Sequence, residues 1–165
     1  MMFLVPVFTT FLLALIITPL VRKTAITVGA IDRPNDRKVH RNTMPRLGGL
    51  AIYISFLIGL ALFPPDFMDV WPVVFGATAI VILGIIDDML SLSAKAKFLG
   101  QIGAALIPVL AGIQIEYITI PNGVVVEFGY LAIPITVFWI VAITNAINLI
   151  DGLDGLAAGV STIAL

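Results

Sequence analysis

Long stretches of apolar residues without a single charge constrain this chain more than any other feature of its sequence. Apolar residues make up 60% of its 165 residues, whereas charged residues make up 12%. A soluble domain carries about a quarter charged residues, and a helix needs roughly 20 apolar residues to cross the hydrocarbon core of a bilayer. This composition excludes a disordered protein, a nucleic-acid binder and an ordinary cytosolic enzyme, and it predicts an integral membrane protein.

The apolar blocks predict an all-α polytopic membrane protein with five complete transmembrane helices and a truncated sixth. The expected spans are, in chain order, about 1–21, 47–65, 70–86, 98–115, 131–150 and 155–165. The last block rises only about 16 Å as a helix, half the thickness of a membrane, so we expect a single membrane domain that is the N-terminal part of a longer protein. The first block is interpreted as a permanent span and not as a signal peptide, because its cations, Arg22 and Lys23, follow the apolar run.

The distribution of charge predicts which loops face the cytoplasm. All nine cations lie in two segments, 22–46 and 95–97, whereas the loops expected on the opposite side hold carboxylates and no cation. Because cytoplasmic loops are enriched in Lys and Arg, we expect an extracytoplasmic N-terminus. The outer loop within 113–130 is rich in β-branched and aromatic residues on both sides of Pro121-Asn122-Gly123. This pattern predicts a small extracytoplasmic β-hairpin, with an irregular loop as the alternative.

Two adjacent carboxylates, Asp87 and Asp88, end the third expected span. Carboxylates near the hydrocarbon boundary usually face a partner, an ion or water, and neighbouring carboxylates repel each other unless a proton or a cation intervenes. Either outcome suits acid–base or metal-assisted chemistry. The alternative is a helix that simply ends at the water interface, although negative charge is unfavourable at the C-terminal end of the helix dipole. Lys97 is expected either to extend toward the interface or to contact a phosphate beside the acidic pair.

Oxygen-bearing side chains recur every three residues at the end of the fifth span, at Asn145, Asn148, Asp151 and Asp154. If the helix continues, this spacing places them on one side. Their oxygens suit Mg²⁺, which uses a few protein ligands together with phosphate and water, and a polar helix end with glycine caps is the alternative. The chain has no cysteine and one histidine, which excludes a thiolate site or a multi-histidine site built within it.

The first basic loop contains more than a topology signal requires. Besides its cations it holds Pro34, Pro45 and Gly48-Gly49, and clustered cations at a membrane surface can hold a lipid phosphate or a pyrophosphate. The residues of this loop that we expect to bind phosphate are Arg37, Lys38, His40 and Arg46, with a purely topological role of the cations as the alternative, and His40 alone does not indicate a base or a ligand. Together with the carboxylates, they predict metal-assisted phosphoryl-type chemistry at the cytoplasmic boundary of the membrane.

Four ordered motifs resemble those of the polyprenyl-phosphate N-acetylhexosamine-1-phosphate transferase superfamily, also called glycosyltransferase family 4. They are 32–40, 45–49, 84–88 and 145–156. The form Pro45-Arg46-Leu47-Gly48-Gly49 looks most like the Gram-positive undecaprenyl-phosphate GlcNAc-1-phosphate transferases that initiate teichoic-acid linkage units. The resemblance implies an enzyme of the bacterial plasma membrane that transfers GlcNAc-1-phosphate from UDP-GlcNAc to undecaprenyl phosphate and releases UMP. It also implies Mg²⁺, or Mn²⁺, as cofactor and a role in the first membrane step of cell-wall polymer synthesis.

The resemblance further implies roles for single residues. Asp87, Asp88, Asp151 and Asp154 match catalytic carboxylates, Lys97 matches a phosphate-contacting lysine, and Asn148 matches a metal-binding asparagine. The family's further metal-binding aspartate and its late His-rich loop do not occur before Leu165, so we expect this chain to be inactive by itself. Membrane lipid is an expected partner, nucleic acid is not, and a homodimer is left open.

Three other interpretations stay open from the sequence. A phospho-MurNAc-pentapeptide transferase of peptidoglycan synthesis belongs to the same superfamily, but a Met-Gly-Gly type sequence would be expected there in place of 46–49. An ion or solute transporter would also carry intramembrane carboxylates, but near the midplane and not at span ends, where Asp87, Asp88 and Asp151 lie. The third interpretation is the product of a broken gene without activity.

Overall fold

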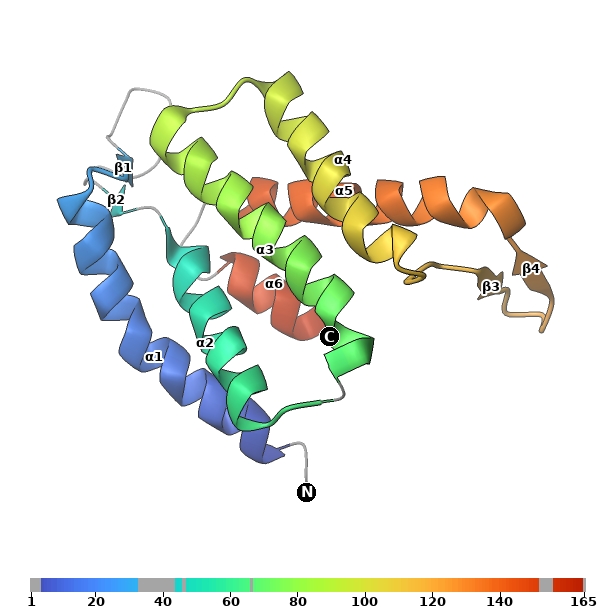
Figure 1. Cartoon of the computed structure of the whole chain (residues 1–165), viewed down its shortest axis with the longest axis horizontal. Helices are drawn as coiled ribbons and strands as arrows, with labels where there is room; N and C mark the ends of the chain where they lie inside the picture. Colours follow the sequence, from blue (N-terminus) through green and yellow to red (C-terminus); the bar gives the residue numbers. More distant parts are fainter. Residues whose placement is uncertain (1–3, 33–43, 46, 66, 152–155, 165) are drawn as a thin grey trace. The chain divides into compact units, whose positions relative to one another are not determined.

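Helices occupy the apolar blocks, and two short antiparallel ladders join segments between them, in the computed structural model of the chain (Figure 1). The structure describes residues 4–32, 44–45, 47–65, 67–151 and 156–164. Its helices are α1 (Leu4–Thr27), α2 (Gly48–Leu62), α3 (Phe67–Leu90), α4 (Ala94–Leu110), α5 (Ala132–Ile150) and α6 (Leu156–Ala164), with a short 3-10 helix, η1 (Gly129–Leu131), before α5. The chain divides into two compact units, Met1–Lys97 and Phe98–Leu165.

Three helical segments of the described chain are long and apolar enough to cross a membrane, namely Leu4–Thr27, Val70–Leu90 and Gly129–Ile150. α2 is apolar but shorter. Large apolar side chains on these helices are exposed, for example Leu20 at 62% and Phe138 at 72%. Apolar surface of this extent is unusual on a soluble monomer, whereas lipid tails would cover it, so the mostly helical fold is that of a membrane protein.

α1 continues beyond the expected end of the first span and includes both Arg22 and Lys23. It ends in a Schellman arrangement, in which Ala30 N donates to Ala25 O at 2.9 Å and Gly29 N donates to Ile26 O at 3.3 Å. Gly29 adopts a φ of 75°, a left-handed conformation that glycine reaches without a steric penalty. The end of α1 is therefore set by Gly29 and not by the first cations.

Small residues pack the first unit, where α1 and α2 lie side by side (Figure 1). Ala51, Ser55 and Gly59 recur at every fourth residue of α2 and are all buried. A Cβ added at Gly59 would lie 2.6 Å from Oγ1 of Thr10 on α1, so the two backbones approach closely. Small residues at four-residue spacing permit this approach between membrane helices.

A ladder that the sequence analysis did not predict closes the first basic loop. β1 (Ile31–Asp32) pairs antiparallel with β2 (Met44–Pro45), with Ile31 opposite Pro45 and Asp32 opposite Met44. Two-residue strands are too short to show an alternating pattern in sequence. The ladder brings the beginning of the 32–40 motif next to the beginning of the 45–49 motif.

The predicted hairpin is confirmed as an antiparallel ladder in the second unit. β3 (Tyr117–Thr119) pairs with β4 (Val125–Glu127), and Gly123 N donates to Ile120 O at 2.8 Å within the turn. Gly123 has a φ of 81°, which explains the glycine at this position. The strands are shorter than the β-rich stretches around them, and Phe128 N donates to Glu116 O at 2.8 Å just beyond their ends.

Candidate functional site

The acidic pair lies in the last turn of α3, which continues past the expected boundary of the third span at residue 86 and runs to Leu90. The Oδ2 atom of Asp87 accepts from Nζ of Lys97 at 2.7 Å, and its Oδ1 atom accepts from Leu92 N at 3.1 Å. The two charged side chains are 23% and 22% exposed. Asp87 therefore ties the end of α3 to the first turn of α4 and holds the ammonium group of Lys97 beside the acidic pair.

The turn between these helices supports the Asp87–Lys97 ion pair. Ser91 has a φ of 51°, and its N–H donates to Asp87 O at 2.8 Å. Ser93 begins the next helix, because its Oγ accepts from Ala96 N at 3.3 Å, as an N-cap serine does. The short connection brings Lys97, in the first turn of α4, within reach of Asp87.

Replacing Ser91 by valine is expected to destabilise this connection. A β-branched residue is strained at positive φ, and the left-handed conformation costs an L-residue about 1–2 kcal/mol. We expect Ser91→Val to lower the thermal unfolding midpoint in detergent, and Ser91→Gly, which fits the same φ, to leave it nearly unchanged. An equal loss in both variants would show that the serine side chain matters and the backbone conformation does not.

Asp88 contacts the segment that precedes α2. Its Oδ2 atom accepts from Leu47 N at 3.4 Å, and the side chain of Leu47 is buried with Val21, Ala25 and Ala51. Leu47 itself has a φ of 71°, and non-glycine residues in such conformations concentrate at functional sites. Asp88 thus joins the end of α3 to the 45–49 motif. The positive N-terminal end of the α2 dipole also stabilises a carboxylate at this place.

The first unit therefore assembles parts of two motifs together with Lys97. The acidic pair, Lys97 and the backbone of the 45–49 motif meet around the C-terminal turn of α3. The lysine ammonium donates to Asp87 at 2.7 Å and carries the positive charge that attracts phosphate oxygens. The arrangement can bind an anionic group through Lys97 and orient it against two carboxylates.

The second unit carries the other polar motif at the end of α5. Asn145 and Asn148 lie on this helix, as their spacing suggested, and Asn148 is exposed. The helix ends at Ile150, so Asp151 is exposed in its cap position, with its N–H donating to Ile147 O at 3.1 Å. The three-residue pattern is thus helical through Asn148, and Asp151 follows on the cap.

Gln101 is a polar residue that the sequence analysis did not single out. It lies on α4 with 3% of its surface exposed and pairs with Asn145, whose Nδ2 donates to Gln101 Oε1 at 2.7 Å. An uncharged amide inside the apolar stretch 98–115 is the signal that could have identified it, because buried polar groups in spans usually face a partner.

The donor set at the end of α5 fits a hard divalent cation. Within the described ranges, no group of three or more His, Cys, Asp or Glu residues could hold a metal ion. Mg²⁺, however, is commonly bound through one or two carboxylates together with substrate phosphates and water. Asn148 and Asp151 offer an amide oxygen and a carboxylate, both exposed, and these residues would hold the ion.

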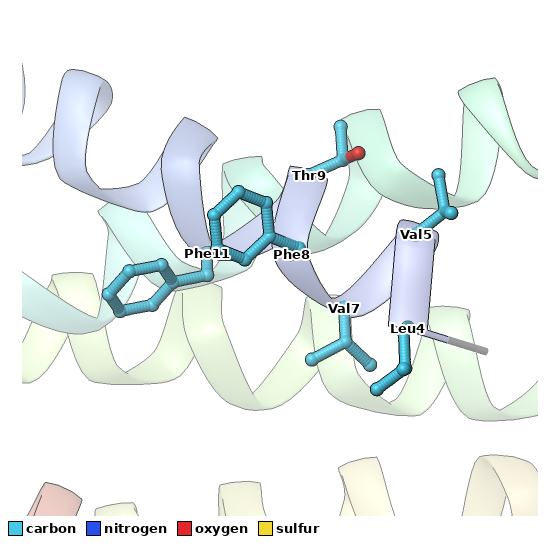
Figure 2. Close-up of a pocket in the computed structure, with 6 residues that line it drawn as sticks. All are labelled: Leu4, Val5, Val7, Phe8, Thr9 and Phe11. Carbon is cyan, nitrogen blue, oxygen red and sulfur yellow. The ribbon is translucent and has the colours of Figure 1, made fainter. Parts of the chain in front are cut away.

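Five expected site residues lie outside the described residues, so their roles stay predictions. They are Arg37, Lys38, His40, Arg46 and Asp154. Figure 2 shows a hollow on the surface that is lined by α1 side chains, Leu4, Val5, Val7, Phe8, Thr9 and Phe11. Among the described residues that line it, Thr9 is the single polar one. This apolar surface suits lipid tails and not a phosphorylated ligand.

Comparison with known proteins identifies the family. Residues 70–165 match the model of glycosyl transferase family 4. A probable undecaprenyl-phosphate N-acetylglucosaminyl 1-phosphate transferase of Bacillus subtilis is 49% identical over 158 residues, which cover 93% of this chain and 44% of the relative. An undecaprenyl-phosphate alpha-N-acetylglucosaminyl 1-phosphate transferase of Salmonella typhi is 32% identical, covering 93% of this chain and 42% of the relative.

A relative with another name also matches. A phospho-N-acetylmuramoyl-pentapeptide-transferase of Pelodictyon phaeoclathratiforme is 34% identical over 154 residues, covering 81% of this chain and 41% of the relative. No solved structure matches the chain. The chain spans less than half the length of these curated relatives. The family match covers more than half of the chain and includes both the acidic pair and the polar end of α5, and the chain therefore belongs to glycosyl transferase family 4.

Proposed function

We propose that the protein transfers GlcNAc-1-phosphate from UDP-GlcNAc to undecaprenyl phosphate, giving undecaprenyl-pyrophosphoryl-GlcNAc and UMP. The proposal rests on the ion pair between Lys97 Nζ and Asp87 Oδ2, which are 2.7 Å apart. Beside it, Asp88 accepts a hydrogen bond from Leu47 N in the 45–49 motif. This places a cation and two carboxylates together in a family whose named members act on polyprenyl phosphates. The higher identity to the GlcNAc-1-phosphate transferase of Bacillus subtilis favours GlcNAc over phospho-MurNAc-pentapeptide.

The chemistry requires an anion to attack an anion. An oxygen of the lipid phosphate forms a bond to the sugar-side phosphorus of UDP-GlcNAc, the bond from that phosphorus to the bridging oxygen breaks, and UMP leaves with the electron pair. A phosphate monoester, with its second pKa of about 6, is mostly ionised near neutral pH. Lys97 would therefore contribute mainly by neutralising charge and the acidic pair by orienting groups. Mg²⁺, held by Asn148 and Asp151, would neutralise charge on the pyrophosphate.

We also propose the orientation of the protein in a bacterial plasma membrane. Arg22 and Lys23 lie near the C-terminal end of α1, and Lys95 and Lys97 lie in the first turn of α4. The β3–β4 hairpin follows the opposite end of α4, and its charged residues are Glu116 and Glu127. By the positive-inside rule, the acidic pair then faces the cytoplasm and the hairpin faces outward.

The direct test measures release of UMP by membranes that contain the full-length gene product. We expect release that requires UDP-GlcNAc, undecaprenyl phosphate and Mg²⁺ together, and that stops when the metal is chelated. UDP-MurNAc-pentapeptide is the matched competing donor. Turnover of that donor in place of UDP-GlcNAc would assign the protein to peptidoglycan synthesis, and turnover of neither donor would contradict the proposal.

A further inference from the structure

An amide pair joins α4 and α5 inside the second unit. Asn145 Nδ2 donates both to Gln101 Oε1 at 2.7 Å and to Val141 O at 2.8 Å, and Gln101 Nε2 lies 3.5 Å from Asn145 Oδ1. Gln101 is 3% exposed, and its buried neighbours along α4 are Ala104 and Ala105. An amide in such apolar surroundings is costly unless it is hydrogen-bonded, so the pairing is specific.

The pair controls which way the end of α5 faces. Asn148 follows Asn145 by less than one helical turn, and Asp151 lies on the cap that ends the same helix. A slip of one residue along α5 would rotate its polar face by about 100°, and it would also separate Asn145 from Gln101. The interhelical hydrogen bond therefore favours a single rotation of α5.

We propose that Gln101 is a positioning residue, which acts through Asn145 to hold Asn148 and Asp151 in the orientation that binds a divalent cation. This inference rests on the proposed function, because it assigns cation binding to the polar end of α5. Gln101 does not touch the ion or the substrates. Its role is comparable to that of the outer hydrogen-bond partners that orient metal ligands, but it acts through Asn145 and α5 and not by a direct bond to Asn148 or Asp151. Loss of a direct partner typically weakens metal affinity about 10–100-fold.

The experiment measures the dissociation constant of Mn²⁺ by electron paramagnetic resonance, on the purified full-length protein without substrates. Gln101→Met preserves the size of the side chain and removes its hydrogen bonds. We expect it to raise the Mn²⁺ dissociation constant by about tenfold or more and to raise by a similar factor the metal concentration needed for half-maximal UMP release. The rate at saturating metal should fall much less.

The matched control removes another amide of the same unit. Gln114 Nε2 donates to Val109 O at 3.0 Å, beyond the opposite end of α4, and Gln114→Met should leave the Mn²⁺ dissociation constant unchanged. If Gln101→Met does not fold because Asn145 has lost its partner, the double variant Gln101→Met/Asn145→Leu serves instead. Replacing both partners by apolar groups leaves no amide of the pair unsatisfied.

The outcomes separate the inference from the proposed function. Unchanged Mn²⁺ affinity in Gln101→Met, or in the double variant, would overturn the positioning role even if the wild-type protein releases UMP. Equal weakening in Gln114→Met would also overturn it, because the effect would then be general. A wild-type protein that binds Mn²⁺ in a Gln101-dependent manner but releases no UMP would contradict the proposed function and support the inference.

Discussion

Replacing Asp87 by asparagine is expected to lower the rate of UMP release by at least about 100-fold, the lower range for loss of a group that acts in proton transfer or charge stabilisation. The carboxylate accepts from Lys97 and from Leu92 N. The amide would keep one acceptor oxygen but lose the charge that holds the ammonium group. Lys97 would then lose the ion pair that places it beside the phosphate it is expected to bind. The measurement is UMP release at saturating substrates in membranes with matched protein content.

A charge reversal distinguishes chemistry from structure. The double variant Asp87→Lys/Lys97→Asp restores an ion pair between α3 and α4, so we expect it to recover thermal stability relative to Asp87→Asn. It should not recover UMP release, because the cation and the carboxylate have exchanged places. Recovery of activity in the reversed pair would show that Asp87 acts only by joining the two helices. Glu127→Gln removes an exposed carboxylate from β4 and should leave UMP release unchanged.

The sequence predicted those parts of the fold that depend on local composition. The apolar blocks located the helices, and the turn residues Pro121-Asn122-Gly123 located the hairpin, because turn chemistry acts over a few neighbouring residues. The ends of the helices were harder to predict from the sequence. Hydropathy places a boundary at the first charge, whereas α1 ends at Thr27, just before Gly29, and α3 ends at Leu90, where backbone conformation and hydrogen bonds determine the end.

The sequence could not predict contacts between distant residues in the candidate site. The pairing of Gln101 with Asn145 spans 44 positions, and nothing local to either residue indicates the other. The sequence offered two roles for Lys97, extension toward the membrane interface or contact with a phosphate. The structure adds an ion pair with Asp87, across a turn whose shape depends on the φ of Ser91. Motif matching predicted the site residues, but tertiary packing decides which of them meet.

Replacing Gly59 by leucine is expected to prevent α1 and α2 from packing against each other. The fraction of the protein that is correctly folded should therefore fall to a small part of the wild-type value. Even the first atom of a side chain at this position would lie 2.6 Å from Thr10 Oγ1, and overpacking a tight contact typically costs about 1–3 kcal/mol or more. The measurement is the fraction of protein that stays monodisperse and protease-resistant in detergent. Gly103→Leu is the matched control, because a Cβ at Gly103 on α4 meets nothing within 4 Å.

A double-mutant cycle tests whether the contact with Thr10 is the cause. Gly59→Ala adds the one atom that approaches Thr10 Oγ1, whose hydroxyl is held in place by its 2.8 Å hydrogen bond to Pro6 O. Thr10→Ala removes that oxygen, while the remaining Cβ, at 3.7 Å, is in ordinary contact. The loss of stability in Gly59→Ala should therefore be largely restored by adding Thr10→Ala. If the two effects are simply additive, α1 and α2 do not meet at these residues.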